Sequence, residues 1–239
     1  MEQTDHRFRD FFYKPENSTK REALLLNKLL YDVQLSSALA GQYIKAYRTD
    51  VDDNGYDLIF DTEMVSRKIQ VKSRMLDATT TSWDIKRGLL RPELSESLRF
   101  GMSANMEVGV SGGVILQEVK MLLGDIEVSY HYTDLSIIRL FQLQIIGNRI
   151  SKRCADKLIQ QLNSGHFHDK VKLQKSLFLK AKSATALIEM MGLTSSFFHV
   201  QLKELLYRRR HKTETLLNDT PKEHVEKDIL TKLQNLCLI

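Results

Sequence analysis

The sequence contains little cysteine, proline or tryptophan, and it lacks long apolar runs. Of its 239 residues, two are cysteine, three are proline and one is tryptophan. Cys154 and Cys237 stand 83 positions apart with no spacing typical of zinc ligands, which favours two free buried thiols. No run of about 18 apolar residues occurs, which excludes a membrane span, and the amino-terminal residues do not have the pattern of a signal peptide. We therefore expect a cytoplasmic protein.

The composition is that of an ordinary globular protein, 42% hydrophobic and 27% charged, but the charge is distributed unevenly. Residues 1–148 carry 18 basic and 21 acidic side chains, whereas residues 149–239 carry 17 and 9. This asymmetry is expected if the first part binds a cation and the second a polyanion, although Lys-rich helices are also common as plain solvated surfaces. No glycine-rich nucleotide loop occurs, so any use of ATP or GTP would belong to a partner.

Hydrophobic periodicity gives the expected elements. Leucines recur at helical spacing after Thr19, and Gly41 stands where that helix would end. Two strands are predicted at about 56–61 and 67–73, joined by a connection of hairpin length. Further strands are predicted at 42–50, 79–87, 113–122 and 126–132, a helix around 92–100, and helices at 148–165, 182–193, 195–217 and 221–239. The segment 133–147 fits a helix or a strand. We predict an α/β domain over residues 1–148 and a basic, mostly helical region over 149–239.

Polar side chains share one face of the strand predicted at 67–73. Because successive side chains on a strand point to opposite faces, Gln70 and Lys72 point the same way. Asp57 begins the preceding strand, and a hairpin of this length can bring its carboxylate beside that pair. A carboxylate, a second oxygen ligand and an ammonium group are the minimum for binding Mg²⁺ and orienting water against a phosphodiester. The alternative is an ordinary hairpin with a solvated polar face.

Glu22 is a fourth candidate. At about 100° per residue it falls on the same helix face as Leu26, Leu29 and Val33, so its carboxylate faces the expected core near the helix start. Binding a metal ion would explain a Glu22 carboxylate at this position. The segment from Thr19 to Glu22 also has the spacing of a capping box, and helix capping is an equally good interpretation.

These segments together resemble the PD-(D/E)xK nuclease superfamily, which has the restriction-endonuclease-like fold. A helix carrying Glu22, then GYDLIFD with Asp57, then IQVKS with Gln70 and Lys72, follow one another in the order and spacing of that superfamily. The resemblance covers about residues 19–120. It implies a mixed β-sheet core flanked by helices. It also implies that Asp57 and Gln70, supported by Glu22, bind Mg²⁺ or Mn²⁺, and that Lys72 positions the attacking water.

The sequence departs from the superfamily pattern at two positions. Tyr56 stands where proline is common, and Gln70 stands where most members have a carboxylate. An amide oxygen can bind Mg²⁺ but supplies a dipole where a carboxylate supplies a full charge, so the expected metal affinity is lower. The superfamily includes active branches with glutamine at this position.

The resemblance implies a metal-dependent DNA endonuclease of restriction or genome-defence type. Gln70 leaves open a second hypothesis, a catalytically silent nuclease-like subunit that binds nucleic acid or assembles with a partner such as an ATPase. A homo-oligomer is compatible with both. A third hypothesis is a DNA-binding regulator, because residues 183–212 have the spacing of a helix-turn-helix.

Basic side chains are the expected contacts to DNA phosphates. Some follow the core strands, and others end the second helix of the helix-turn-helix pattern. Bundle packing and the favourable interaction of cations with a helix carboxyl end explain the same pattern without DNA. The predicted contacts are Lys86, Arg87, Arg91, Arg208, Arg209, Arg210 and Lys212.

Overall fold

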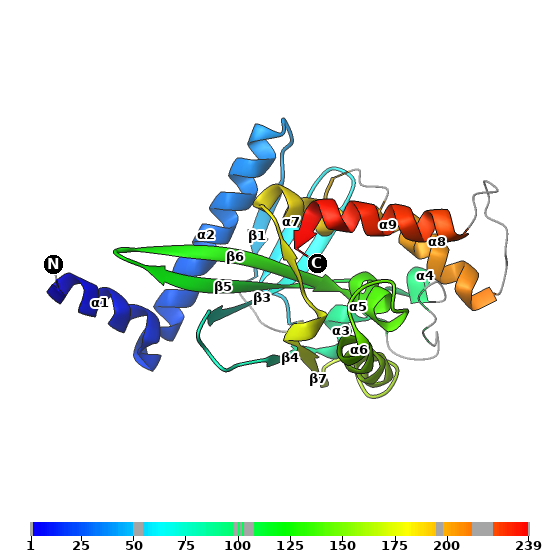
Figure 1. Ribbon diagram of the computed structural model, residues 1–239, viewed down its shortest axis with the longest axis horizontal. Coiled ribbons are helices and arrows are strands. Elements are labelled where there is room, and N and C mark those ends of the chain that lie inside the picture. Colours follow the sequence, from blue (N-terminus) through cyan, green and yellow to red (C-terminus); the bar gives the residue numbers. More distant parts are fainter. Residues whose placement is uncertain are drawn as a thin grey trace.

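A mixed β-sheet with helices around it forms the centre of the protein (Figure 1). The computed structural model describes residues 2–49, 55–97, 100, 102, 108–194, 198–211 and 222–238. Within these residues the sheet has seven strands in the order β1-β2-β3-β5-β6-β8-β9, and β4 pairs separately with β7. Neighbouring strands run antiparallel except β3 and β5, which are parallel. The predicted mixed α/β architecture is confirmed.

The elements have the following bounds. The strands are β1 (Lys45–Arg48), β2 (Leu58–Asp61), β3 (Ser66–Met75), β4 (Ser82–Lys86), β5 (Gly113–Leu122), β6 (Asp125–Asp134), β7 (Lys170–Gln174), β8 (Leu179–Ala181) and β9 (Cys237–Leu238). The α-helices are α1 (Glu2–Tyr13), α2 (Ser18–Leu39), α3 (Arg87–Leu90), α4 (Leu94–Ser97), α5 (Leu135–Gln142), α6 (Arg149–Leu162), α7 (Ala184–Met190), α8 (Phe198–His211) and α9 (Lys222–Leu236). Two short 3-10 helices are η1 (Pro15–Asn17) and η2 (Lys175–Leu177). Among the described helices, none is both long and apolar enough to cross a membrane.

The ambiguous segment after β6 is a helix because Asp134 caps it. Its carboxylate oxygen Oδ1 accepts a hydrogen bond from Ile137 N at 2.9 Å, which satisfies one of the free N–H groups at the start of α5. The β-branched residues of this segment, which favour a strand by propensity alone, are buried in the core instead. Capping and burial therefore outweighed β propensity here.

The region after residue 148 contains the four predicted helices, α6 to α9, but it also contributes strands that the sequence pattern did not indicate. β8 pairs with β6, where Leu179 lies opposite Tyr132, and β9 pairs with β8. β7 pairs with β4. The central sheet therefore includes strands from both sides of residue 148.

Two of the predicted DNA contacts lie in the interior. Arg87 and Arg91 are both 0% exposed. Arg87 Nε donates to the carbonyl of Leu162 at 3.2 Å, and Arg91 Nη1 donates to the same carbonyl at 2.6 Å. Leu162 is the last residue of α6, where carbonyl groups lack partners within the helix and a cation interacts favourably with the helix dipole. The assignment of these two arginines to a phosphate-binding surface is therefore wrong.

Replacing Arg91 with leucine should lower the free energy of unfolding by about 2–4 kcal/mol, because a buried charged donor to the end of α6 is lost. Equilibrium denaturation in urea measures this change. Arg153 is an exposed arginine on α6, and Arg153→Leu is the matched control, with an expected change within about 0.5 kcal/mol. Unchanged stability of Arg91→Leu together with weakened DNA binding would instead support the surface role.

Candidate functional site

The candidate site lies where β2 stops pairing with β3. Leu58 opposite Ile69 is the last pair of this hairpin, whereas β5 continues along the other side of β3 as far as Met75. Past Ile69, β3 thus has no paired strand on the β2 side within the described residues. An unpaired strand edge presents free backbone N–H and C=O groups. The Asp57 carboxylate binds one of them, since its Oδ2 accepts a hydrogen bond from Val71 N at 2.6 Å.

Backbone hydrogen bonds to both neighbouring strands fix the position of Asp57. Its N–H donates to the carbonyl of Ile69 at 2.8 Å, and its carbonyl accepts from Thr49 N at 3.2 Å. The Thr49 hydroxyl donates to the carbonyl of Tyr56 at 2.7 Å. The Asp57 carboxylate is therefore oriented before any ligand binds.

A cavity of about 630 Å³ at this edge is lined by all four side chains that the sequence singled out. Asp57 comes from the start of β2, Gln70 and Lys72 from β3, and Glu22 from the second turn of α2. Residues 70–73 all line the cavity, so it is bordered by side chains from both faces of the open strand edge. The structure thus brings together the residues that the sequence placed far apart along the chain.

Gln70 carries a buried polar atom without a hydrogen-bond partner in the described structure. It is 8% exposed, and its side-chain oxygen Oε1 has no hydrogen-bond partner among the described residues. Leaving a buried acceptor without a partner costs about 1–3 kcal/mol, so such groups call for a specific explanation. A cation or a hydrogen-bond donor bound in the cavity would provide the missing partner.

Lys72 and Glu22 also lack partners in the described part of the chain. Lys72 is half-buried and Glu22 is exposed, and neither forms a hydrogen bond or ion pair with another described residue. Helix α2 begins at Ser18 with Asn17 at its N-cap, so Thr19 lies inside the helix. The capping-box interpretation of Glu22 is therefore wrong. The expected position of Glu22 among core side chains is also corrected, because it faces the cavity from the exposed side of α2.

Two hydrogen bonds attach α2 to the sheet and so position Glu22. Gln117 on β5 is 1% exposed, and its Nε2 donates to the carbonyl of Leu25 at 2.8 Å. The hydroxyl of Tyr130 on β6 donates to Asp32 Oδ2 at 2.5 Å. Gln117 is a positioning residue that the sequence analysis missed. The only sequence signal was that Gln117 follows three apolar residues in the run GVILQEVKML.

The cavity offers two carboxylates and one amide oxygen as ligands. No group of three or more His, Cys, Asp or Glu side chains able to hold a metal occurs among the residues described. Oxygen ligands suit hard cations such as Mg²⁺, which keeps several of its waters and needs only one or two carboxylates from the protein. Gln70, whose Oε1 has no described partner, and the oriented carboxylate of Asp57 line the same cavity, and this donor set fits such an ion.

A buried cluster of charged side chains lies next to the site, two residues further along β3. Arg74 shares the strand face of Gln70 and Lys72, and its Nε lies 3.3 Å from Glu118 Oε1. Lys175 Nζ lies 2.5 Å from the same oxygen. Arg74 also donates to backbone carbonyls of the turn that leads to β4, those of Met75, Leu76, Ala78 and Thr80. The cluster therefore fixes the connection between β3 and β4.

His131 completes this cluster in its neutral form. Its Nε2 lies 3.4 Å from Glu118 Oε2. Burial lowers the pKa of His131 to about 4, although the charge of Glu118 opposes this shift. Burial would by itself raise the pKa of the Glu118 carboxyl, but the hydrogen bond and charge of Lys175, with His131 and Arg74, outweigh it and lower that pKa. The cluster is thus a carboxylate held by two cations beside a neutral imidazole.

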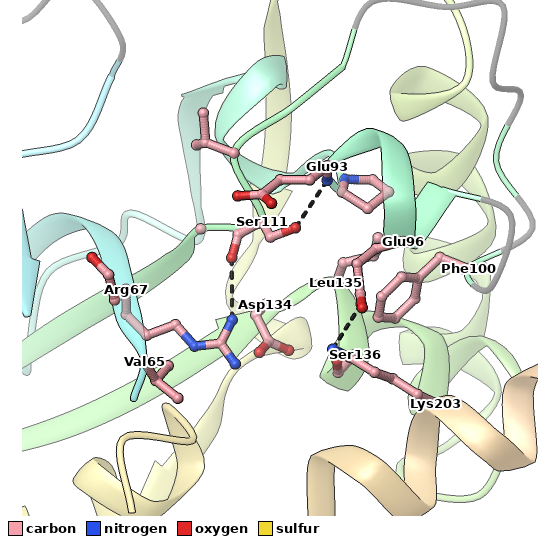
Figure 2. A pocket seen from close by; sticks show the side chains of 14 residues that line it. Val65, Arg67, Glu93, Glu96, Phe100, Ser111, Asp134, Leu135, Ser136 and Lys203 are labelled. Carbon is pink, nitrogen blue, oxygen red and sulfur yellow. Dashed lines mark hydrogen bonds and ion pairs between the residues drawn. The ribbon is translucent and has the colours of Figure 1, made fainter. Parts of the chain in front are cut away.

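A second cavity, of about 300 Å³, lies between β3, β6, α4 and α8 (Figure 2). Several of its charged groups have partners within the protein, although the Glu93 carboxylate has none among the described residues. Glu96 and Lys203 form an ion pair at 2.7 Å, and Arg67 donates to the carbonyls of Met191 and Ser111 at 2.7 and 3.4 Å. In Figure 2 these side chains point toward one another across the cavity. We interpret it as a structural polar cluster that joins α8 to the sheet.

The described Lys and Arg side chains of α8 form ion pairs within the protein. Arg208 is 3% exposed and forms an ion pair with Glu204 at 3.0 Å, so its assignment to a DNA-contacting surface is wrong. The apolar side of α8 is buried in the core through Leu202, Leu205 and Leu206. The side chains of Arg209 and Arg210, all of Lys212 and residues 195–197 of the turn before α8 lie outside the described residues, and the helix-turn-helix stays a prediction. Lys86 is half-buried, and its contact with DNA also stays a prediction.

Comparisons with protein-family models, curated proteins and solved structures found no match to this chain. The PD-(D/E)xK resemblance therefore stays a prediction. It is based on the order of four residues along the chain, and the structure adds that these four line one cavity.

The His131 pKa predicts how stability depends on pH. In the unfolded chain His131 takes up a proton near pH 6.5, whereas in the folded protein it does so only near pH 4. The stability is therefore complete above pH 6.5 and is lost as the pH falls toward 4, by up to about 1.4 kcal/mol per pH unit. Glu118 adds its own loss only below about pH 4.5, the ordinary value for a carboxyl.

Urea denaturation of the wild type and of His131→Gln between pH 6.5 and 4.5 isolates this contribution. The slope of stability against pH should be shallower in the variant. His168 is exposed, and His168→Gln should keep the wild-type slope. An equal slope in all three proteins would contradict the assignment of the pH dependence to His131.

Proposed function

We propose that the protein is a metal-dependent DNA endonuclease of restriction or genome-defence type, and that its active site is the cavity at the open edge of β3. The observation that carries this proposal is that Gln70, whose buried Oε1 has no partner among the described residues, lines one cavity together with Asp57 and Lys72. The order of these residues along the chain, which resembles the PD-(D/E)xK superfamily, supports the same function.

Asp57, Gln70 and Glu22 would hold the Mg²⁺ or Mn²⁺ ion. When bound, the ion supplies charge stabilisation at the phosphate and lowers the pKa of a water molecule. The chain contributes ligands of mixed strength: the Asp57 carboxylate is oriented by Val71 N, whereas Gln70 brings a neutral oxygen. Glu22 supplies a second negative charge, which offsets part of what the glutamine lacks.

Lys72 would act on the substrate directly. Its ammonium group has no partner among the described residues and lines the same cavity as the ligand oxygens. A cation held there attracts a phosphate oxygen, stabilises the negative charge that develops during in-line hydrolysis and holds the attacking water. Arg48, exposed on the cavity wall, is placed to contact a neighbouring phosphate.

A catalytically silent nucleic-acid-binding or assembly subunit is the second candidate function. It is favoured by the glutamine at the position of a superfamily carboxylate, which leaves the cavity with two carboxylates. Such a subunit would keep Arg48 and Lys72 in the cavity wall and bind DNA, alone or with a partner such as an ATPase. Cleavage assays separate it from the first proposal.

Lys72→Ala should reduce Mg²⁺-dependent cleavage of supercoiled plasmid by at least about 100-fold, because a charge directed at the transition state is removed. Its stability should change by less than about 0.5 kcal/mol, since Lys72 has no described partner. Lys120 is an exposed lysine of β5 paired with Glu127, and Lys120→Ala is the matched control with full activity expected. Retained cutting by Lys72→Ala would rule out this active site, and no cutting by the wild type would favour the silent subunit.

Gln70→Glu tests the metal site by a measurement other than activity. Without metal, the new carboxylate is buried near Asp57, and the repulsion between the two should lower the melting temperature. Mg²⁺ should raise the melting temperature of the variant more than that of the wild type, because the variant site binds the ion more tightly. Gln70→Leu should show a smaller Mg²⁺-dependent shift than the wild type, because one ligand oxygen is lost while Asp57 and Glu22 remain. Equal shifts in Gln70→Glu and Gln70→Leu would show that Gln70 is not a ligand.

A further inference from the structure

An aromatic side chain forms part of the wall of the candidate active site. Trp83, the single tryptophan of the chain, lies on β4 and is half-buried. It lines the same cavity as Asp57, Gln70 and Lys72. An edge-to-face contact with Phe178, at 5.8 Å between ring centroids and 78° between planes, fixes its ring. Trp83 therefore presents a rigid aromatic surface next to the groups proposed to act on phosphate.

The fold holds β4 against the segment that carries Asp57. Gly55 has a φ of +75°, and a Cβ added there would lie 2.7 Å from Lys86 Cβ. This position requires glycine both for its left-handed backbone and for the close approach of β4. Because Trp83 lies on the same short strand as Lys86, the cavity wall bearing Trp83 is kept beside the start of β2.

A second aromatic residue, Tyr56, lines the cavity but is already engaged. Lys68 Nζ lies 5.9 Å from the centre of its ring, in a cation–π contact. Trp83 has no such cation in the described residues, and its indole N–H donates to none of them. Trp83 is therefore the better surface for a bound aromatic group.

We propose that the cavity binds an unpaired nucleotide of the DNA substrate, with its base stacked on Trp83. This inference rests on the proposed nuclease function, which accounts for the phosphate end of the nucleotide. Bases within a duplex are stacked on one another, whereas an unpaired base can stack on an aromatic side chain, whatever its sequence. The cavity of about 630 Å³ falls in the range that encloses a group of nucleotide size. The substrate class is therefore DNA with a single-stranded segment, such as an overhang or a flap.

Trp83 fluorescence reports on this cavity alone, because the chain has no other tryptophan. The test uses the full chain with Ca²⁺ in place of Mg²⁺, and a single-stranded DNA of about 12 nucleotides, within the site sizes of single-strand-binding proteins. We expect quenching by this strand, and little quenching by its blunt duplex or by a strand whose sugars carry no bases. Equal quenching by the baseless strand, or quenching by the blunt duplex alone, would overturn the proposal.

A second test compares the affinities of Trp83 variants for labelled single-stranded DNA, measured by fluorescence anisotropy. Trp83→Leu should bind the single strand about tenfold more weakly, and Trp83→Phe should keep most of the affinity because a ring remains. Tyr43 is 79% exposed and does not line the cavity, so Tyr43→Leu is the matched control. Wild-type affinity in a folded Trp83→Leu protein would overturn the proposal. If Trp83→Leu does not fold, the quenching experiment on the wild-type protein decides instead.

Cleavage assays in Mg²⁺ distinguish a failure of this inference from a failure of the proposed function. If no substrate is cut but the single strand quenches Trp83, the stacking proposal is supported and the nuclease function is not. If blunt duplex is cut in a Lys72-dependent way and Trp83→Leu cuts it at the wild-type rate, the nuclease function is supported and the stacking proposal is overturned.

Discussion

The hydrogen bond from Val71 N to the Asp57 carboxylate is the interaction on which the candidate site depends. Because β2 begins only at Leu58, the backbone of β3 beyond Ile69 has no described partner on that side, and a free N–H group there must bind water or a side chain. The Asp57 carboxylate binds it and is thereby held in one orientation at the strand edge. The same limit of β2 opens the cavity that Gln70 and Lys72 line. A single feature of the sheet thus both opens the site and orients its central acid.

The alternation of side chains along β3 divides its polar residues between two roles. Gln70 and Lys72 face the cavity, whereas Arg74, two residues further on the same face, binds Glu118 and the turn that leads to β4. Removing charges from water is expensive unless each is paired, and Arg74 has partners around it. This satisfied cluster supports the less satisfied residues next to it, and through β4 it also helps to position Trp83.

The two cavities differ in whether their polar side chains have partners within the protein. In the cavity of Figure 2, Glu96 binds Lys203 and Arg67 binds backbone carbonyls, so these charges are used by the fold itself. In the cavity at the edge of β3, Gln70 and Lys72 have no partners within the described chain. Leaving the buried Gln70 acceptor without a partner costs free energy, and a bound ion or water is one way in which such a group is satisfied. A count of basic residues predicts a binding surface poorly for a related reason: Arg87, Arg91 and Arg208, three of the expected DNA contacts, are buried and bind groups within the protein.

The sequence by itself determined the helix α2, the β2–β3 hairpin and the shared face of Gln70 and Lys72, because these follow from periodicities of 3.6 and 2 residues within short segments. It did not indicate β8 and β9, which are too short to show a period and form only because the edge next to β6 is available. Nor could it distinguish exposed from buried arginines, since burial depends on what packs against a residue from elsewhere in the chain. Only the tertiary structure decided that Glu22 lines the cavity and that Trp83 lies beside Asp57, because those contacts join segments whose separation in sequence carries no information about their distance in space.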